Sequence, residues 1–355
     1  AVELMCRDAP RAIIELEHWG ALFNRTEAGR LAQRPFGGAG FARTCFAADK
    51  TGHVLQTTIY EQTRKNGVQI YEEWFATSLV VEDNLSKGLT AIELVTGEVN
   101  AIQAKVVILA TGGAGQVYSK TTNSLTTTGD GIAMAYNVGL PIEDMEFVQF
   151  HPTSLYGSNI LVSEGARGEG GYLVNALGER FMKKYAPDKM ELAPRDIVSR
   201  SIETEIREGR GFEGGYVHLD LRHLGEAKIN ERLPTIRELA IYFAGADPVK
   251  EPIPIQPAQH YTMGGVPTDL DGTTSIKGLY AAGECACVSV HGANRLGGNS
   301  LLDTIVFGRR AGAKAAEYVK EVSVTSFPEG PLKEEQKRIE TLLNRKEGVK
   351  ASEIK

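Results

Sequence analysis

The segment HGANRLGGNSLLD, residues 291–303, places Arg295 among three glycines. Glycine has no side chain, so the backbone at such positions can approach a flat or charged group closely. An arginine in such a place usually faces an anion, because its guanidinium matches a carboxylate or phosphate with two parallel hydrogen bonds. The segment therefore predicts an anion site beside a close passage of the main chain.

Two segments in the middle of the chain carry side chains suited to proton transfer. EFVQFHPTSL contains His151, and LVSEGARGEGG contains Ser163, Glu164 and Arg167. Glu164 and Arg167 are three residues apart, so a helical turn would place them side by side. Structural readings are open too: His151 as a hydrogen-bonded core residue, and the ion pair as a solvated pair worth under about 1 kcal/mol. The flanking glycines and the preceding apolar strand argue against full exposure of this pair.

Two further segments add a cation and a second imidazole. LAPRDIVSR begins a helix at Arg195, and QPAQHYTMGG contains His260 beside glycines. A helix-capping turn explains the PRD sequence as well as a catalytic role does.

Two buried strands are expected to end in turns that contact a nucleotide. VVILATGGAG places Thr111, Gly112 and Gly113 after one strand, and GLYAAGECA places Glu284 after another. Glycines there permit backbone approach to a phosphate, and a carboxylate at a strand end commonly accepts hydrogen bonds from sugar hydroxyls. Asp130, in TTTGDGIAMA, stands at a helix start, either as a cap or as an acceptor for a ligand hydroxyl. A tight structural turn explains the first segment alone, but the two turns together favour a flavin dinucleotide.

Composition excludes several classes of protein. The 355 residues are 42% hydrophobic and 24% charged, as in ordinary globular proteins, and the net charge of -6 argues against nucleic-acid binding. The four cysteines include no C-x-x-C pair, so neither a metal site nor an iron–sulfur cluster is predicted. No apolar run approaches the roughly 18 residues of a membrane span. Both ends fall inside amphipathic helical patterns, so we expect a piece of a longer chain.

In order along the chain stand HPT, EGARGEGG, PRD, HYTMGG, GLYAAGE and HGANRLGGNSLLD. Over nearly the whole chain these strings resemble the flavoprotein subunit of succinate dehydrogenase and fumarate reductase, the complex II family. RLGGNSLLD is more similar to the succinate dehydrogenase branch. L-aspartate oxidase shares FHPT and RGEG but usually lacks the double glycine. The resemblance implies that the family's amino-terminal G-x-G-x-x-G strand and flavin-linking histidine, and most of its carboxy-terminal part, are missing from these residues.

The strand–glycine–helix passages predict an α/β fold, and the resemblance specifies it. We expect an incomplete Rossmann-like FAD-binding domain interrupted by an α+β capping domain. The predicted boundaries are 1–145 and 263–322 for the two parts of the FAD-binding domain, 146–262 for the capping domain, and 323–355 for the start of a helical region.

The resemblance also implies roles for individual residues. The carboxylates of the substrate are expected to bind to His151, Ser163, His260 and Arg295. The proton acceptor is Arg195, with Glu164 and Arg167 as its relay, because a guanidinium cannot simply give up its proton. The implied FAD contacts are Thr111, Gly112, Gly113, Asp130, Glu284, Arg295, Ser300 and Leu301. Phe41 is expected to be the aromatic neighbour of the substrate.

The implied function is oxidation of succinate to fumarate by hydride transfer to FAD. Electrons would pass to an iron–sulfur subunit and, through membrane-anchor subunits, to quinone, since this chain has no cluster ligands. The chain would then lie peripherally on the cytoplasmic face of a prokaryotic plasma membrane or the matrix side of the mitochondrial inner membrane, touching the membrane only through its partners. The alternatives are a fumarate reductase or L-aspartate oxidase of the same fold, and a non-enzymatic reading, an inactive flavin-fold fragment.

Overall fold

A pair of parallel strands brings the two predicted nucleotide turns together. β6 (Val107–Leu109) pairs with β12 (Leu279–Ala281). Parallel strands end at the same edge of a sheet, so the turns that follow them meet there. A Cβ added at Gly113, after β6, would overlap the carboxylate of Glu284, after β12. A side chain at position 113 would therefore displace the carboxylate of Glu284.

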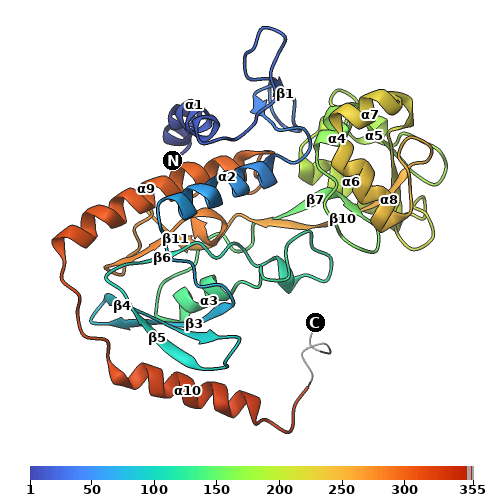
Figure 1. Ribbon diagram of the computed structural model, residues 1–355. Helices are drawn as coiled ribbons and strands as arrows, with labels where there is room; N and C mark the ends of the chain where they lie inside the picture. Colours follow the sequence, from blue (N-terminus) through green and yellow to red (C-terminus); the bar gives the residue numbers. More distant parts are fainter. Residues whose placement is uncertain (350–352, 354–355) are drawn as a thin grey trace.

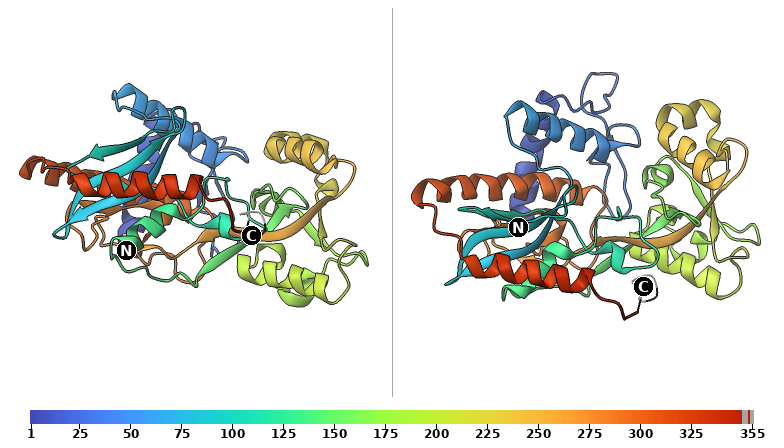
Figure 2. Two further views of the ribbon diagram at one scale, coloured as in Figure 1. Left: turned by 90° about the horizontal axis from the view of Figure 1, so that it is seen from below. Right: turned by 60° about the horizontal axis from the view of Figure 1, so that its bottom comes forward.

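The computed structural model describes residues 1–349 and residue 353 (Figure 1). Around the parallel pair lie a meander and long helices, which Figure 2 shows from two further sides. The meander is antiparallel, with β4 between β3 and β5, and α10 packs on it. The elements of this part are α1 (Val2–His18), β1 (Gln33–Arg34), β2 (Thr44–Cys45), α2 (Thr51–Lys65), β3 (Trp74–Glu82), β4 (Leu85–Glu93), β5 (Val99–Gln103), α3 (Asp130–Asn137), β11 (Val266–Pro267), β13 (Ala286–Cys287), α9 (Asn299–Glu321) and α10 (Glu329–Leu343).

The middle of the chain builds a second sheet with its own helices. The strand order is β7-β10-β9-β8, and all neighbouring pairs are antiparallel. α6 packs on β7 and β10, and α8 packs on the same two strands. The elements are β7 (Val148–Leu155), α4 (Gly165–Gly168), β8 (Tyr172–Val174), α5 (Met182–Tyr185), α6 (Arg195–Arg207), β9 (Val217–Asp220), α7 (Glu226–Arg232), α8 (Pro234–Ala244) and β10 (Ile253–Thr262).

The middle of the chain and the parts on either side of it enclose separate apolar cores. Buried residues of one core lie between Leu155 and Ile255, all within the predicted capping domain. Those of another lie in 79–140 and 266–285, on both sides of that insertion. Separate cores support the predicted division, whose boundaries stay a prediction.

Helix α9 begins where the HGANRLGG segment ends. Gly298 takes a left-handed conformation, with φ of 84°, just before the first helical residue. Such a φ favours glycine, so the double glycine lets the chain turn sharply into the helix. α9 then packs against α1 through Met5, Val306 and Phe307.

The carboxy-terminal helical pattern is shorter than the sequence predicted. α10 ends at Leu343, followed by Asn344 and, soon after, by Gly348 with φ of 139°. Asparagine and glycine commonly end helices, which explains the stop. The rest of the predicted pattern, in 350–352 and 354–355, lies outside the described residues.

Candidate active site

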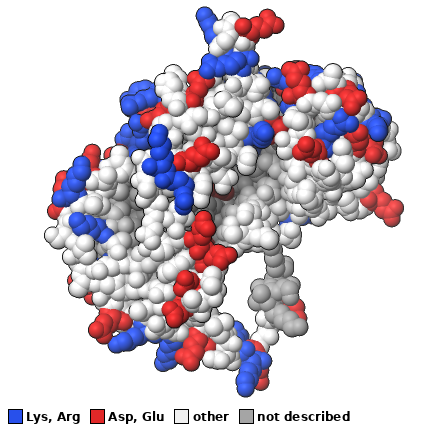
Figure 3. Space-filling view, viewed as in Figure 1, with Lys and Arg blue, Asp and Glu red and all other residues white. Residues whose placement is uncertain are grey.

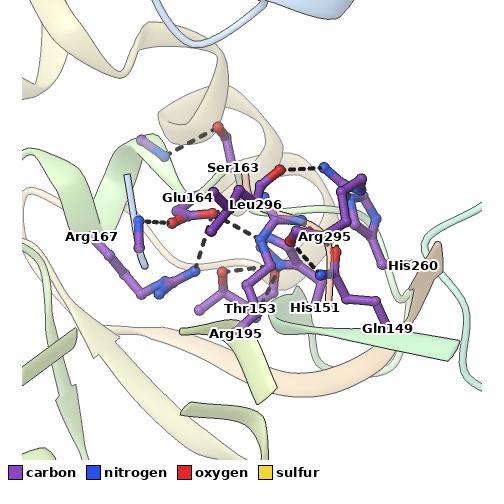
Figure 4. Close-up of polar contacts among 12 residues, drawn as sticks. Gln149, His151, Thr153, Ser163, Glu164, Arg167, Arg195, His260, Arg295 and Leu296 are labelled. Carbon is purple, nitrogen blue, oxygen red and sulfur yellow. Dashed lines mark hydrogen bonds and ion pairs between the residues drawn. The ribbon is translucent and has the colours of Figure 1, made fainter. Parts of the chain in front are cut away.

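Charged and imidazole side chains from five distant segments meet where the capping sheet faces the start of α9 (Figure 4). They come from β7, the residues in and before α4, the first residue of α6, β10, and the glycine-rich segment before α9. The structure brings together all the predicted substrate and proton-transfer residues: His151, Ser163, Glu164, Arg167, Arg195, His260 and Arg295.

Glu164 and Arg195 form the strongest ion pair of this cluster. The Nε of Arg195 donates to Oε2 of Glu164 at 2.8 Å, and its NH2 lies 2.7 Å from the same oxygen. Both residues are buried, so the pair is sheltered from screening by salt. The backbone N–H of Gly37 donates to the other oxygen, Oε1. The predicted partner Arg167 lies farther away, with its NH2 3.9 Å from Oε2.

These contacts decide the charge of the carboxylate. Burial opposes ionisation of Glu164, but Arg195, Arg167 and the Gly37 N–H outweigh it, so the pKa of Glu164 lies below its usual value. Burial lowers the pKa of the Arg167 guanidinium. Two nitrogens of Arg167, Nε and NH2, have no hydrogen-bond partner within residues 1–349 and 353, while NH1 donates to the carbonyl of Glu191 at 2.7 Å. Glu164 is thus an ionised acceptor between two arginines.

The two histidines are neutral. Burial, reinforced by the charge of Arg195, holds the pKa values of His151 and His260 well below the usual range. Their rings meet edge to face at 4.9 Å. The Nδ1 of His260 is 2.7 Å from the hydroxyl of Thr122, which leaves Nε2 available to another group. The imidazoles therefore offer hydrogen bonds rather than charge.

Arg295 is a buried cation whose hydrogen-bond partners among the described residues are all neutral. Its NH1 donates to the carbonyl of Leu296 at 3.1 Å, and its NH2 donates to Oε1 of Gln149 at 3.0 Å. Its Nε has no partner, and the guanidinium lies 4.4 Å from the ring centre of Tyr261. Burial and then the charge of Arg195 lower the pKa of Arg295 to about 9. A cation so placed is stabilised by an anion that enters beside it.

A cavity of about 800 Å³ opens beside this cluster. Four of the predicted residues line it: Ser163, Arg195, His260 and Arg295. His151, Glu164 and Arg167 do not line it, so they touch the site only through the residues in front of them. The face shown in Figure 3 is hollowed near its middle, with charged side chains of both signs nearby and uncharged residues along part of the border.

The prediction for the aromatic neighbour of the substrate was wrong. Phe41 is 68% exposed and does not line the cavity. Phe36 does line it, and Gly37 next to it holds Glu164. Both phenylalanines flank the same glycine-rich loop, PFGGAGF, so the sequence alone did not show which one faces inward.

The predicted FAD contacts form two adjoining groups. Arg295, Ser300 and Leu301 line the cavity. Thr111, Gly112, Gly113, Asp130 and Glu284 do not; they lie at the ends of β6 and β12 and at the start of α3. The groups meet through Glu284, whose carboxylate accepts from the backbone N–H of Thr262, two residues beyond His260. Asp130 is the first helical residue rather than the cap, which is Gly129.

Glu284 gives a structural test of the cofactor. Burial raises the pKa of its carboxyl group to about 7. Among the described residues it has a single hydrogen-bond partner, the Thr262 N–H, so one of its oxygens remains for a ligand hydroxyl. A partly desolvated carboxylate beside a glycine turn suits a sugar or ribityl chain. The residues present therefore fit this part of FAD.

Gln149 is a member of the cluster that the sequence did not reveal. It lies in β7, two residues before His151, and is buried. Its Oε1 accepts from NH1 of Arg195 and NH2 of Arg295, both at 3.0 Å. The alternation of a strand gives the only signal, because residues two apart point to the same face.

Comparisons with known proteins agree with this geometry. The FAD binding domain family matches residues 1–301. The succinate dehydrogenase flavoprotein subunit of Rickettsia conorii is 50% identical over 99% of this chain and 61% of its own length. The fumarate reductase flavoprotein subunit of Mycobacterium tuberculosis is also 50% identical, over 90% of this chain and 57% of its own length. The chain thus spans about three fifths of the relatives it matches.

Solved structures show the same fold. A quinol-fumarate reductase with menaquinol molecules superposes with a TM-score of 0.92 at 44% identity, covering 99% of this chain and 64% of that chain. Mycobacterium smegmatis Sdh1 gives a TM-score of 0.76 at 38% identity, covering 99% and 60%. Within residues 1–349 and 353, no helix is long and apolar enough to cross a membrane. The mixed helix-and-sheet flavoprotein fold predicted from the sequence is confirmed, and the chain belongs to the FAD binding domain family, with FAD as its cofactor.

Proposed function

We propose that this chain is the flavin- and substrate-binding part of a succinate dehydrogenase that oxidises succinate to fumarate. The observation that carries the proposal is Arg295, a buried guanidinium on the wall of a cavity shared with Ser163, Arg195 and His260. It has no carboxylate partner in the part of the chain that the structure describes. Arg295 lies between the residues predicted to contact FAD and the capping sheet. A small anion bound there would lie beside the cofactor.

The charge of the site suits a dicarboxylate. Arg167, Arg195 and Arg295 carry three positive charges, Glu164 carries one negative charge, and both histidines are neutral. These residues carry a net charge of two positive, and Arg34, Arg43 and Asp49 on the cavity wall add one more, so the site attracts a dianion. Arg295 and His260 would hold one end of succinate and Ser163 the other, through charge-assisted or neutral hydrogen bonds.

Oxidation removes a hydride from one methylene carbon of succinate and a proton from the next. FAD, when bound, supplies the acceptor for the hydride and so takes up two electrons. Arg195 lines the cavity and accepts the proton on its guanidinium. Its Nε and NH2 both contact Oε2 of Glu164, so a proton passes to that oxygen as the substrate proton arrives. The guanidinium then keeps one positive charge throughout, which avoids a neutral arginine.

Arg167 is the next group along this relay. It lies 3.9 Å from Glu164, and burial lowers its pKa, which makes exchange of its proton less costly. The Arg195–Glu164 contact supports the relay more strongly than the spacing of Glu164 and Arg167 did, because it joins the proton acceptor itself to the carboxylate. The contact links the first residue of α6 to the residue just before α4.

A fumarate reductase is the second candidate, favoured by the 50% identity to the M. tuberculosis fumarate reductase flavoprotein subunit. The same site serves both directions, since fumarate is also a dianion. We propose an iron–sulfur subunit as electron acceptor and a peripheral place on a membrane through anchor subunits, as the bacterial and mitochondrial succinate dehydrogenase relatives suggest.

The function is tested with the FAD-loaded protein. Addition of succinate should bleach the flavin absorbance, malonate should block the bleaching, and fumarate should restore the colour. L-aspartate in place of succinate separates an L-aspartate oxidase from this proposal. An unchanged spectrum after succinate addition would contradict it and favour an inactive flavin-fold protein. Copurification of an iron–sulfur protein would distinguish a complex-bound dehydrogenase from an enzyme that acts alone.

A further inference from the structure

We propose that Gln149 is a positioning residue. It holds Arg195, the proton acceptor, and Arg295, which binds a substrate carboxylate, in fixed relative positions without neutralising the charge of either. This inference rests on the proposed function. Gln149 lies behind the cavity wall and does not line the cavity, whereas Arg195 and Arg295 do. It therefore acts through them.

The orientation of the Gln149 amide follows from its surroundings. Oε1 lies 3.0 Å from nitrogen donors of both Arg195 and Arg295. Nε2 donates to Oδ1 of Asn294 at 2.7 Å and to the backbone carbonyl of Arg295 at 2.6 Å. The reversed amide would place an NH2 group against two guanidinium groups and a carbonyl against two acceptors. All four hydrogen bonds thus require the observed orientation.

These bonds hold Arg295 by both its side chain and its backbone. Gln149 accepts from the guanidinium and donates to the carbonyl of the same residue. Asn294, the residue before it, links onward to Asp196 at 2.6 Å, next to Arg195. A closed ring of contacts therefore connects the strand β7, the start of α6 and the glycine-rich segment. Such a ring fixes where the proton acceptor stands relative to the clamped carboxylate.

The neutrality of Gln149 matters as much as its geometry. A glutamate of nearly the same shape would accept from both arginines, but it would lose the two hydrogen bonds that Nε2 donates and would add a negative charge to the cluster. The attraction of the site for a dicarboxylate would then be weaker. An amide oxygen is an acceptor without this cost, because it carries no net charge.

Gln149 also lines a second hollow. This surface pocket of about 510 Å³ is lined by Gln149, Asp196 and Asn294, none of which lines the first cavity. A substitution that shortens the side chain would leave a gap behind Arg195 and Arg295. Methionine is therefore the matched apolar replacement, because it keeps the length of glutamine and removes its hydrogen bonds.

Two variants of the FAD-loaded protein separate the two roles. Gln149→Glu should raise the KM for succinate and the Kd for malonate about ten- to hundred-fold, with a smaller loss of kcat at saturating succinate. Gln149→Met should lower kcat about ten- to hundred-fold, because Arg195 loses its fixed position, and should raise the malonate Kd less than Gln149→Glu does, because Arg295 loses two hydrogen bonds but the charge of the site is unchanged. FAD content per protein and melting temperature are recorded for both variants as controls for folding.

The decisive result is a larger effect on KM in Gln149→Glu and a larger effect on kcat in Gln149→Met. A residue that only supports the fold would change KM, kcat and FAD content together. If the parent protein binds malonate and oxidises succinate, and both variants match it within about two-fold, the role of Gln149 is overturned while the proposed function stands. A joint loss of FAD and of every kinetic parameter in both variants would also overturn it. A parent protein that neither binds malonate nor responds to succinate would overturn the proposed function and, with it, this inference.

Discussion

Arg195 and Arg295 share an acceptor and line one cavity, yet they differ in their counter-charge. Arg195 makes two contacts under 3 Å with the carboxylate of Glu164, whereas the hydrogen bonds of the Arg295 guanidinium to described residues go only to Gln149 and the carbonyl of Leu296. Both are buried. The fold thus neutralises Arg195 with a carboxylate of its own, whereas the charge of Arg295 remains to be neutralised by a bound anion. A compensated arginine with a carboxylate behind it suits proton transfer, and an uncompensated one suits anion binding.

Among the variants that test this difference between the two arginines, Arg195→Lys is expected to have the largest effect, a loss of turnover. Lysine keeps one positive charge but cannot contact Glu164 through two nitrogens and Gln149 through a third. Turnover with succinate should fall about 10²–10⁴-fold, the usual contribution of a positioned acid–base group. The malonate Kd should stay within about three-fold, since the charge remains. Steady-state kinetics and calorimetric titration give both values; near-normal turnover would remove Arg195 as the proton acceptor.

The comparison itself is tested by replacing each arginine with methionine. Arg195→Met leaves Glu164 buried without its main partner and should lower the free energy of unfolding by about 3 kcal/mol. Arg295→Met removes a buried charge that has no carboxylate partner, so the free energy of unfolding without ligand should change by less than about 1 kcal/mol or increase. Urea unfolding of both variants without malonate decides the matter. Equal destabilisation would show that the two arginines are not differently compensated.

A smaller effect is expected on ligand affinity when the uncompensated arginine is removed. Arg295→Ala should weaken malonate binding by about 1.5–3 kcal/mol, the value of a charge-assisted hydrogen bond, or roughly 10- to 150-fold in Kd. Arg295→Lys is the control, and it should fall between the parent and the alanine variant because the charge stays but the planar fork is lost. Malonate titration of the FAD-loaded protein gives the constants. An unchanged inhibition constant in Arg295→Ala would refute the clamp.

The sequence predicted the members of this site better than their pairing. The motifs named His151, Glu164, Arg195 and Arg295, and the structure brings all of them together. The spacing of Glu164 and Arg167 predicted an adjacent pair, but Arg195, from another helix, is the closer partner. Local spacing describes neighbours on one element, whereas ion pairs in a buried site are set by how distant elements pack.

The same reason explains what the sequence did not predict. Gln149 joins Arg195 and Arg295 across 46 and 146 positions of the chain, and the Gly37 N–H reaches Glu164 across 127. A glutamine in an apolar strand and a backbone amide in a loop carry no chemical signature of their own. His151 was expected to hold substrate, yet it lies behind His260 in the described structure and does not line the cavity. Its direct contact with substrate stays a prediction.

Glu284 extends the comparison to a carboxylate, with the smallest expected effect. Like Arg295 it is largely buried, and among the described residues it has no ion-pair partner and only the Thr262 N–H as a hydrogen-bond donor. Burial raises its pKa to about 7, whereas an unfolded glutamate has a pKa of about 4.3. Between these values the folded FAD-free protein retains a proton that the unfolded chain has lost. Stability therefore falls as pH rises through this window and is level above it.

Glu284→Gln should remove this pH dependence without removing the shape of the side chain. With an allowance for its partial exposure, the parent protein should lose about 2 kcal/mol of unfolding free energy between about pH 5 and about pH 8 through this group. The glutamine variant should match the parent near pH 5 and exceed it near pH 8. Urea unfolding of both FAD-free proteins at the two pH values measures the difference. A variant that loses as much stability as the parent would show that Glu284 is solvated in the folded protein, and that the compensation argued for the arginines does not extend to it.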